Sequence, residues 1–168
     1  MEATLLNQSD NGQIKLREIS LFNWGSFAEL HTAHIDPNGT LITGDNGAGK
    51  STLVDGLMAL LMPPSKANFN IAAAQNDKAD RTILSYMRGS YGQEHDGTTT
   101  ATKSKRSQKV VTGLRAYYRQ DNGNDITLIA IFWADNTAIS ASDVKRLYLV
   151  VNRDVKLKTV LAEFDEKY

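Results

Sequence analysis

The sequence predicts an α/β fold in which a mixed β-sheet surrounds a phosphate-loop helix, with further antiparallel strands beside it. Three observations lead to this fold class. Residues 44–52, GDNGAGKST, fit the pattern G-x-x-x-x-G-K-[S/T] of phosphate-binding loops. A helical pattern follows the loop directly, and β-prone segments flank both on either side. With 168 residues and 41% hydrophobic content, the chain has room for one folded domain with a core.

The first half of the chain is expected to contain two strands, the loop and its helix. Residues 1–13 are predicted to be a mobile polar arm, and residues 14–168 to form a single lobe. Strands are predicted at 14–24 and 27–35, with a bulge at Arg17 and Glu18, where the alternation of apolar residues breaks. A β-prone run at 39–43 leads into the loop. The helix at 51–62 has apolar residues at the i, i+1, i+4, i+7 and i+8 positions that bury one side.

The second half is expected to be mainly β-structure. A short helix is predicted at 79–88, strands at 110–118, 126–133 and 147–151, and a helix at 156–167. The run at 126–133 is almost wholly apolar, which is typical of a strand buried on both faces. Residues 121–124, Asp-Asn-Gly-Asn, predict a hairpin turn before it.

Residues 89–109 have an unusual composition. They are rich in Gly, Thr and Ser and predict a flexible loop. The loop ends in a basic cluster, of which Lys103, Lys105 and Arg106 are candidate contacts to DNA phosphates. A simpler interpretation is a solvated hairpin tip that its lysines keep soluble, and the sequence favours this second interpretation.

The chemistry of residues 44–52 predicts binding of a nucleoside triphosphate. Gly47 and Gly49 permit the turn that directs backbone N–H groups at a polyphosphate. Lys50 supplies a charge to the β- and γ-phosphates and is the candidate catalytic residue, while the Ser51 hydroxyl suits Mg²⁺. The following helix directs its positive end at the same anion. The residues expected to bind nucleotide are Gly44, Asp45, Asn46, Gly47, Ala48, Gly49, Lys50, Ser51 and Thr52.

Composition excludes several other classes. The formal net charge is zero, so a nucleic-acid contact requires a local patch. The absence of cysteine excludes disulfides and thiolate metal sites. The polar start does not resemble a signal peptide, and no apolar run approaches membrane-spanning length. These features predict a cytoplasmic protein.

The loop, read as G-x-N-G-x-G-K-S-T, resembles those of ABC-type ATPases and especially of SMC-like chromosome and repair ATPases. Because no guanine-reading Asn-Lys-x-Asp motif occurs, ATP is favoured over GTP. A strand that ends in Asn23-Trp24, a second strand, the loop and its helix also follow the order of SMC-like heads, and this resemblance covers roughly residues 14–151. Residues 69–91 resemble the SMC-like, MukB-related subunit of the Wadjet plasmid-defence condensin.

This resemblance implies the N-terminal half of an ATPase head. Such a head dimerises on ATP and drives DNA translocation or loop extrusion, here in anti-plasmid defence. The implied partners are the C-terminal half of the same head across a coiled coil, a second head, kleisin-type and accessory subunits, and double-stranded DNA. Because the acidic Mg²⁺ ligand and the catalytic glutamate belong to the C-terminal half, the isolated chain is expected to be nearly inactive.

The resemblance also points to residues outside the loop. It makes Asn23 and Arg81 candidate contacts to nucleotide or DNA, and for Arg81 an ordinary role on a helix surface is equally favoured. Family members often carry a basic residue after the Asn-aromatic pair, where this sequence has Gly25. Gln75 is a candidate for the Mg²⁺-contacting glutamine, although a surface role is favoured.

An alternative is a self-contained small P-loop NTPase that uses Asp135 as its Mg²⁺-orienting acid. Asp135 comes just after the apolar run at 126–133, and in complete NTPases the acidic residue likewise stands at the end of an apolar strand. It would then have to lie on a strand beside residues 41–42, with its carboxylate near Ser51. Asn136 follows it instead of a catalytic glutamate, and Asp-Asn also favours a turn. A vestigial loop in a structural domain is the third interpretation, and the intact Lys50 argues against it.

Overall fold

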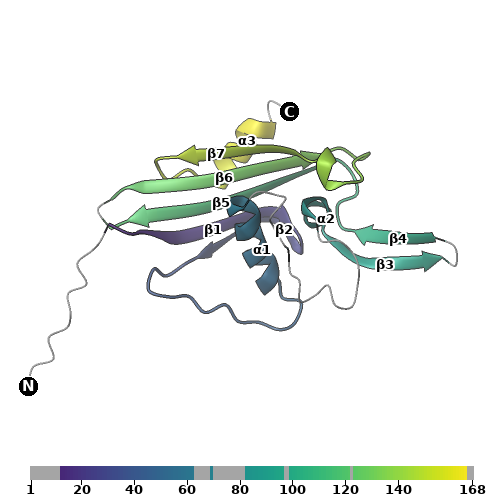
Figure 1. Ribbon diagram of the computed structural model, residues 1–168, viewed down its shortest axis with the longest axis horizontal. Helices are drawn as coiled ribbons and strands as arrows, with labels where there is room; N and C mark the ends of the chain where they lie inside the picture. The colour runs from purple at the N-terminus through teal and green to yellow at the C-terminus, as the bar shows by residue number, and fades with distance from the viewer. Residues whose placement is uncertain (1–11, 63–68, 70–81, 97–98, 122, 166–168) are drawn as a thin grey trace, which may run out of the picture.

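The computed structural model describes residues 12–62, 69, 82–96, 99–121 and 123–165, and its main feature is a five-stranded sheet with helices on both faces (Figure 1). The strand order is β2-β1-β5-β6-β7. These strands are β1 (Ile14–Trp24), β2 (Phe27–His34), β5 (Val110–Gln120), β6 (Asp125–Ala134) and β7 (Lys145–Val151). The helices are α1 (Lys50–Leu61), α2 (Ile83–Arg88) and α3 (Leu157–Asp165). None of the helices among these residues is long and apolar enough to span a membrane.

The strands lie where their sequence patterns predict them, and the irregularities follow the sequence too. The register between β1 and β5 shifts between Leu16 and Glu18, which confirms the predicted bulge. The turn from β5 to β6 is closed by two hydrogen bonds, in which Gly123 N donates to Gln120 O at 3.0 Å and Gln120 N donates to Asn124 O at 2.8 Å. This confirms the predicted hairpin.

Strand β6, which lies between β5 and β7, has a hydrophobic core on each of its faces, as its apolar sequence predicts. On one face, Phe132 is fully buried in a core that includes Trp24 of β1 and residues of α1 and α2. On the other face, Ile129 and Ile131 pack in a core with Leu157 of α3. Burial of one aliphatic or aromatic side chain stabilises the folded state by about 1.5–3 kcal/mol, so β6 contributes to the stability of both cores.

The segment before the phosphate loop does not form the predicted strand. Residues 39–43 have no regular structure, and Leu41 is 86% exposed and Ile42 41% exposed. A strand needs a neighbour for its backbone N–H and C=O groups, and the described part of the chain offers none here. All pairings in the five-stranded sheet are therefore antiparallel, whereas the sequence predicted a mixed sheet.

Residues 89–109 contain a β-hairpin, in line with the favoured interpretation of a hairpin tip, and its strands are regular where the composition predicted a flexible loop. Its strands are β3 (Ser90–Asp96) and β4 (Thr99–Ser104). Lys105 N donates to Gly89 O at 3.3 Å and Arg106 N to Arg88 O at 3.0 Å, so the base of the hairpin is bonded to the end of α2. The helix α2 begins at Thr82, whose side chain forms a capping box with Ser85. The predicted arm at 1–13 lies outside the described residues as far as position 11, and the first part of the predicted helix at 79–88 also lies outside them.

A buried arginine connects the sheet to the segment before α3. Arg115 of β5 is 1% exposed, and its guanidinium lies 2.8 Å from Glu18 Oε2 and 2.6 Å from Asp154 Oδ1. Arg115 Nε also donates to Val155 O at 2.6 Å. Lys156 Nζ joins the same two carboxylates at 3.1 and 3.0 Å. Four charges from three segments therefore form one network.

The network makes the stability of the fold depend on acidic pH. Burial raises the pKa of Glu18 and of Asp154, but hydrogen bonds from Arg115 and Lys156 outweigh it, so both pKa values are lowered. A lowered folded-state pKa gives stability that is present above the unfolded value, near 4, and is lost as the pH falls through the folded value. We expect the free energy of unfolding to decrease below about pH 4 in urea titrations. Between pH 6 and pH 3 the free energy of unfolding of the variant Glu18→Gln should decrease less than that of the unaltered chain. An equal decrease would show that Glu18 is not a source of this pH dependence.

Candidate nucleotide-binding site

The phosphate loop adopts the backbone conformation that its glycines permit. Gly44, Gly47 and Gly49 have φ values of 151, 86 and 93°, in the region that side-chain-bearing residues rarely occupy. Ala48 N donates to Asp45 O at 3.2 Å, which closes the turn. Gly49 ends the loop as the N-cap of α1. A Cβ at Gly49 would lie 3.0 Å from Phe27 Cζ, so β2 also limits this position to glycine.

Lys50 and Ser51 occupy the first turn of α1, where the loop ends. Lys50 Nζ donates to Gly44 O at 2.6 Å and to Asp45 O at 2.8 Å, so its ammonium lies across the loop. Ser51 is exposed and lines the hollow beside the loop. The first N–H groups of a helix have no partner within it and favour an anion. The loop, the ammonium and the helix end therefore suit one polyphosphate, and the Ser51 hydroxyl suits the Mg²⁺ that accompanies it.

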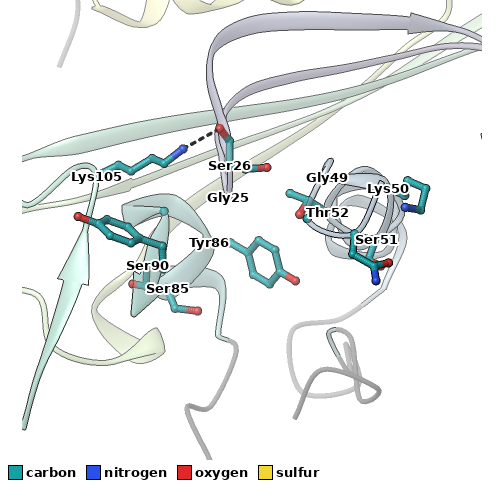
Figure 2. A pocket seen from close by; sticks show the side chains of 14 residues that line it. Gly25, Ser26, Gly49, Lys50, Ser51, Thr52, Ser85, Tyr86, Ser90 and Lys105 are labelled. Atoms are coloured by element: carbon teal, nitrogen blue, oxygen red, sulfur yellow. Dashed lines mark hydrogen bonds between the residues drawn. The ribbon is translucent and has the colours of Figure 1, made fainter. Parts of the chain in front are cut away.

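A pocket of about 500 Å³ lies between the loop and a second wall (Figure 2). The loop side is formed by Asn46, Gly47, Gly49, Lys50, Ser51 and Thr52. The opposite side is formed by Gly25 and Ser26 between β1 and β2, by Ser85, Tyr86 and Gly89 of α2 and its end, and by Ser90, Tyr91 and Lys105 of the hairpin. Segments from four parts of the chain thus meet at one cavity.

Aromatic residues behind the loop hold α1 in place. Trp24 Nε1 donates to Thr52 O at 3.0 Å. The Trp24 ring stacks on Tyr86, with centroids 4.6 Å apart and an interplanar angle of 13°. The Tyr86 hydroxyl donates to Asp55 of α1, and both residues are buried. A Cβ at Gly56 would lie 2.7 Å from Leu21 Cδ2, which shows how closely α1 packs on β1. The sequence alone does not point to Tyr86 or Asp55, because their contact joins positions 31 residues apart.

Asn23 has a structural environment at the end of β1. Its Nδ2 donates to Val111 O at 3.2 Å, and its Oδ1 accepts from Glu29 N at 3.2 Å. With φ of 52°, Asn23 is one of two non-glycine residues with positive φ in the described chain. It does not line the pocket at the phosphate loop. The other predicted contacts, Arg81 and Gln75, lie outside the described residues.

The three basic residues predicted to contact DNA have different environments. Arg106 Nε donates to Met87 O at 2.6 Å and its Nη2 to Gly25 O at 3.0 Å, and burial lowers its pKa. Arg106 therefore joins the hairpin to α2 and to the β1–β2 turn instead of facing solvent. Lys103 is exposed on β4. Lys105 lines the pocket, and its Nζ donates to Ser26 O at 3.2 Å.

Asp135 does not meet the condition for a Mg²⁺-orienting acid. It follows β6, whose neighbours are β5 and β7, and residues 41–42 are not a strand beside it. Its side chain is 57% exposed, with Oδ2 3.9 Å from Lys145 Nζ. Asp135 lines neither of the two hollows that Ser51 lines. The alternative of a self-contained NTPase with Asp135 as its acid is wrong on this geometry.

Comparison with known proteins agrees with the loop geometry. Residues 16–76 match the family model described as the P-loop containing region of AAA domains. The chain is similar to the chromosome partition protein MukB of Haemophilus ducreyi, with 34% identity over 105 residues, which is 60% of this chain and 7% of that protein. It is also similar to the retron Vc95 probable ATPase of Vibrio cholerae, with 38% identity over 52 residues, or 31% of this chain and 10% of that protein.

These similarities support an α/β domain that contains a P-loop. The matched family region contains most of β1, β2, the loop and α1, and so includes the loop side of the pocket and the β1–β2 turn on its opposite side. The matched segments are short parts of both relatives, 7% and 10% of their lengths.

Proposed function

We propose that this chain is the ATP-binding N-terminal half of an SMC-like ATPase head, which hydrolyses ATP only together with a C-terminal half-head. The P-loop region and the similarity to MukB and to a probable ATPase support ATP as the ligand. Lys50 would place positive charge on the β- and γ-phosphates, and Ser51 would hold Mg²⁺, which supplies further charge stabilisation for phosphoryl transfer.

The observation that supports a half-head is the apolar surface beside the loop. A second hollow, of about 440 Å³, is lined by Ile42, Lys50, Ser51, Val54 and Asp55. Ile42 and Val54 are 41% and 51% exposed. Leu41, the residue before Ile42, is 86% exposed, and Leu61, about two turns after Val54 on α1, is 48% exposed. Exposed apolar residues beside a functional site, such as Ile42 and Val54 in this hollow, are typical of a surface that another protein segment covers. A covering segment here would lie directly beside Ser51, where a water-orienting acid is required.

Two such heads would dimerise around bound ATP and separate after hydrolysis, and this cycle would drive DNA translocation or loop extrusion. By resemblance this cycle would serve a Wadjet-type plasmid-defence complex, with kleisin-type and accessory subunits as further partners. The similarity to a chromosome partition protein supports a DNA-directed role. Lys103, which is exposed on β4, stays a candidate for contact with DNA phosphates.

ATP turnover tests the half-head. We expect negligible turnover by the purified chain, and turnover in a mixture with a C-terminal half-head that carries the Ser-Gly-Gly loop and the acidic strand. The variant Val54→Asp should abolish the activity of the mixture, because it places a charge on the apolar surface. The matched variant Ile139→Asp changes a residue that is 91% exposed and lines neither hollow, and should leave the activity unchanged.

Turnover of about 1 s⁻¹ or more by the chain alone, dependent on Lys50, would overturn the half-head proposal. Equal activity of both aspartate variants in the mixture would separate ATP hydrolysis from the apolar surface and would argue against docking at Ile42 and Val54.

A further inference from the structure

The pocket beside the phosphate loop has a second wall that the loop motif does not explain. Among the residues that line this pocket, the charged side chains are two lysines, Lys50 on the loop side and Lys105 on the hairpin side, and no carboxylate lines it. A pocket with two cations on opposite walls, surrounded by Gly, Ser, Thr, Asn and Tyr, favours an anion long enough to meet both.

Lys105 is directed into this pocket by its place at the base of the hairpin. It comes directly after β4, and its backbone N donates to Gly89 O at 3.3 Å. Its Nζ donates to Ser26 O at 3.2 Å, and Figure 2 shows the side chain extending toward Ser26. An ammonium group has three donors, and this bond uses one of them. The cation is thus held at the pocket with capacity for further acceptors.

The position of the second wall is fixed by close backbone packing. Arg106 donates to the carbonyl oxygens of Met87, Gly25 and Tyr86 at 2.6, 3.0 and 3.3 Å. A Cβ at Gly89 would lie 2.7 Å from Gly25 O, so hairpin and turn approach as closely as glycine permits. A Cβ at Gly25 would lie 2.5 Å from Thr52 Cγ2, and its φ is +56°. The β1–β2 turn therefore has no room for a side chain of its own at Gly25, and Lys105 provides the cation on this side.

An aromatic ring lies on the same wall. Tyr91, the second residue of β3, lines the pocket and is 65% exposed. Exposed large aromatic side chains beside a polar pocket offer a flat apolar face, on which a purine base can stack with a gain of about 1–3 kcal/mol. Lys105 and Tyr91 together present a cation and a ring to one cavity, opposite Lys50.

We propose that the base of the hairpin is the nucleoside side of the nucleotide site: Lys105 binds the α-phosphate, and Tyr91 stacks on the base. This inference rests on the proposed binding of ATP at the phosphate loop. In this arrangement Lys50 binds the β- and γ-phosphates, while the α-phosphate and the base are bound by residues that lie far from the loop in the sequence. It also gives Lys105 a role in nucleotide binding, distinct from the exposed Lys103 two residues before it.

Equilibrium binding of ATP and of inorganic triphosphate to the 168-residue chain and its variants tests this assignment. Lys105→Ala should weaken ATP binding about tenfold, since it removes a charge-assisted hydrogen bond. Lys105→Arg should restore most of the affinity. Lys103→Ala removes the same charge from a position of β4 that does not line the pocket, and should bind ATP as the unaltered chain does.

The ring is tested by the difference between the two ligands. Tyr91→Ala should weaken ATP binding about fivefold or more and leave the affinity for inorganic triphosphate unchanged, because triphosphate has no base to stack. Tyr91→Phe should bind ATP with nearly full affinity. An unchanged midpoint of thermal unfolding in each variant shows that the hairpin remains folded, and the Lys105→Arg rescue shows that charge is the property required.

The outcomes separate this inference from the proposed function. If Lys50→Ala binds ATP as tightly as the unaltered chain, the proposed ATP site itself is wrong. If Lys50→Ala loses ATP while Lys105→Ala and Tyr91→Ala retain it, the loop binds ATP and the hairpin assignment is overturned. Equal losses for Lys103→Ala and Lys105→Ala would also overturn it, because they would indicate a general effect of surface charge.

Discussion

Replacement of Lys50 by alanine is expected to lower the affinity for ATP by about 100-fold or more. The ammonium lies 2.6 and 2.8 Å from the carbonyl oxygens of Gly44 and Asp45, so it is already positioned over the loop. Charge-assisted hydrogen bonds contribute about 1.5–3 kcal/mol each, and loss of two of them corresponds to a factor of 100 or more. Titration of the chain with a fluorescent ATP analogue, followed by competition with ATP, measures this loss.

Lys158→Ala is the matched control for Lys50→Ala. Lys158 is exposed on α3 and lines neither hollow beside the loop, so its removal takes away one charge without changing the site. We expect its ATP affinity to equal that of the unaltered chain. If both variants bind ATP equally well, the lysine of the motif has no part in binding, and the loop is vestigial.

The phosphate loop could be predicted from the sequence because its requirements are local. Positive φ at Gly47 and Gly49 and a lysine at the start of α1 depend on neighbours within one turn of the chain. The bulge at Glu18 could be predicted for the same reason, since a break in the apolar alternation shows it directly. Likewise β6 has apolar residues on both faces, and both faces are buried.

The second wall of the pocket could not be predicted, because it depends on contacts between distant segments. Arg106 bonds to Gly25, 81 residues away, and this contact makes it a structural residue although its sequence neighbours suggest a DNA-binding cluster. The composition of residues 89–109 predicted a flexible segment and favoured a solvated hairpin tip, and the segment does pair with itself as a hairpin. The contact of its base with the β1–β2 turn was not predicted. Composition describes the tendency of isolated segments, whereas a ladder of hydrogen bonds requires a partner that composition does not identify.

At residues 39–43 a strand was predicted from the sequence and did not form. The residues of this segment are β-prone, but strand formation requires a neighbouring strand, and Leu41 is instead 86% exposed. The condition on Asp135 failed for a topological reason, because β6 lies between β5 and β7 and not beside the loop segment. Local sequence patterns fix what a segment can form, and the topology decides which segments meet.

Replacement of Arg115 by alanine should reduce the free energy of unfolding by about 3 kcal/mol or more. Arg115 is 1% exposed and bonds to two carboxylates, and removal of one partner of a buried pair costs about 3–5 kcal/mol because it leaves charge without compensation. Glu18 and Asp154 are 16% and 33% exposed and keep Lys156 Nζ at 3.1 and 3.0 Å, so water and Lys156 compensate their charge in part, and the lower end of this range is expected. Urea unfolding at pH 7 measures the loss.

A surface pair on the same strand provides the comparison that identifies the cause. Arg119 is 55% exposed and lies 3.7 Å from Asp125, so Arg119→Ala should change stability by no more than about 1 kcal/mol. Both variants remove one positive charge, so the difference between their losses of stability measures the effect of burial and geometry. Arg115 also bonds to Val155 O, two residues before α3, so its loss should release α3 from the sheet before the rest unfolds. Hydrogen exchange would then accelerate first in α3, and uniform acceleration over the whole sheet would contradict this role of the network.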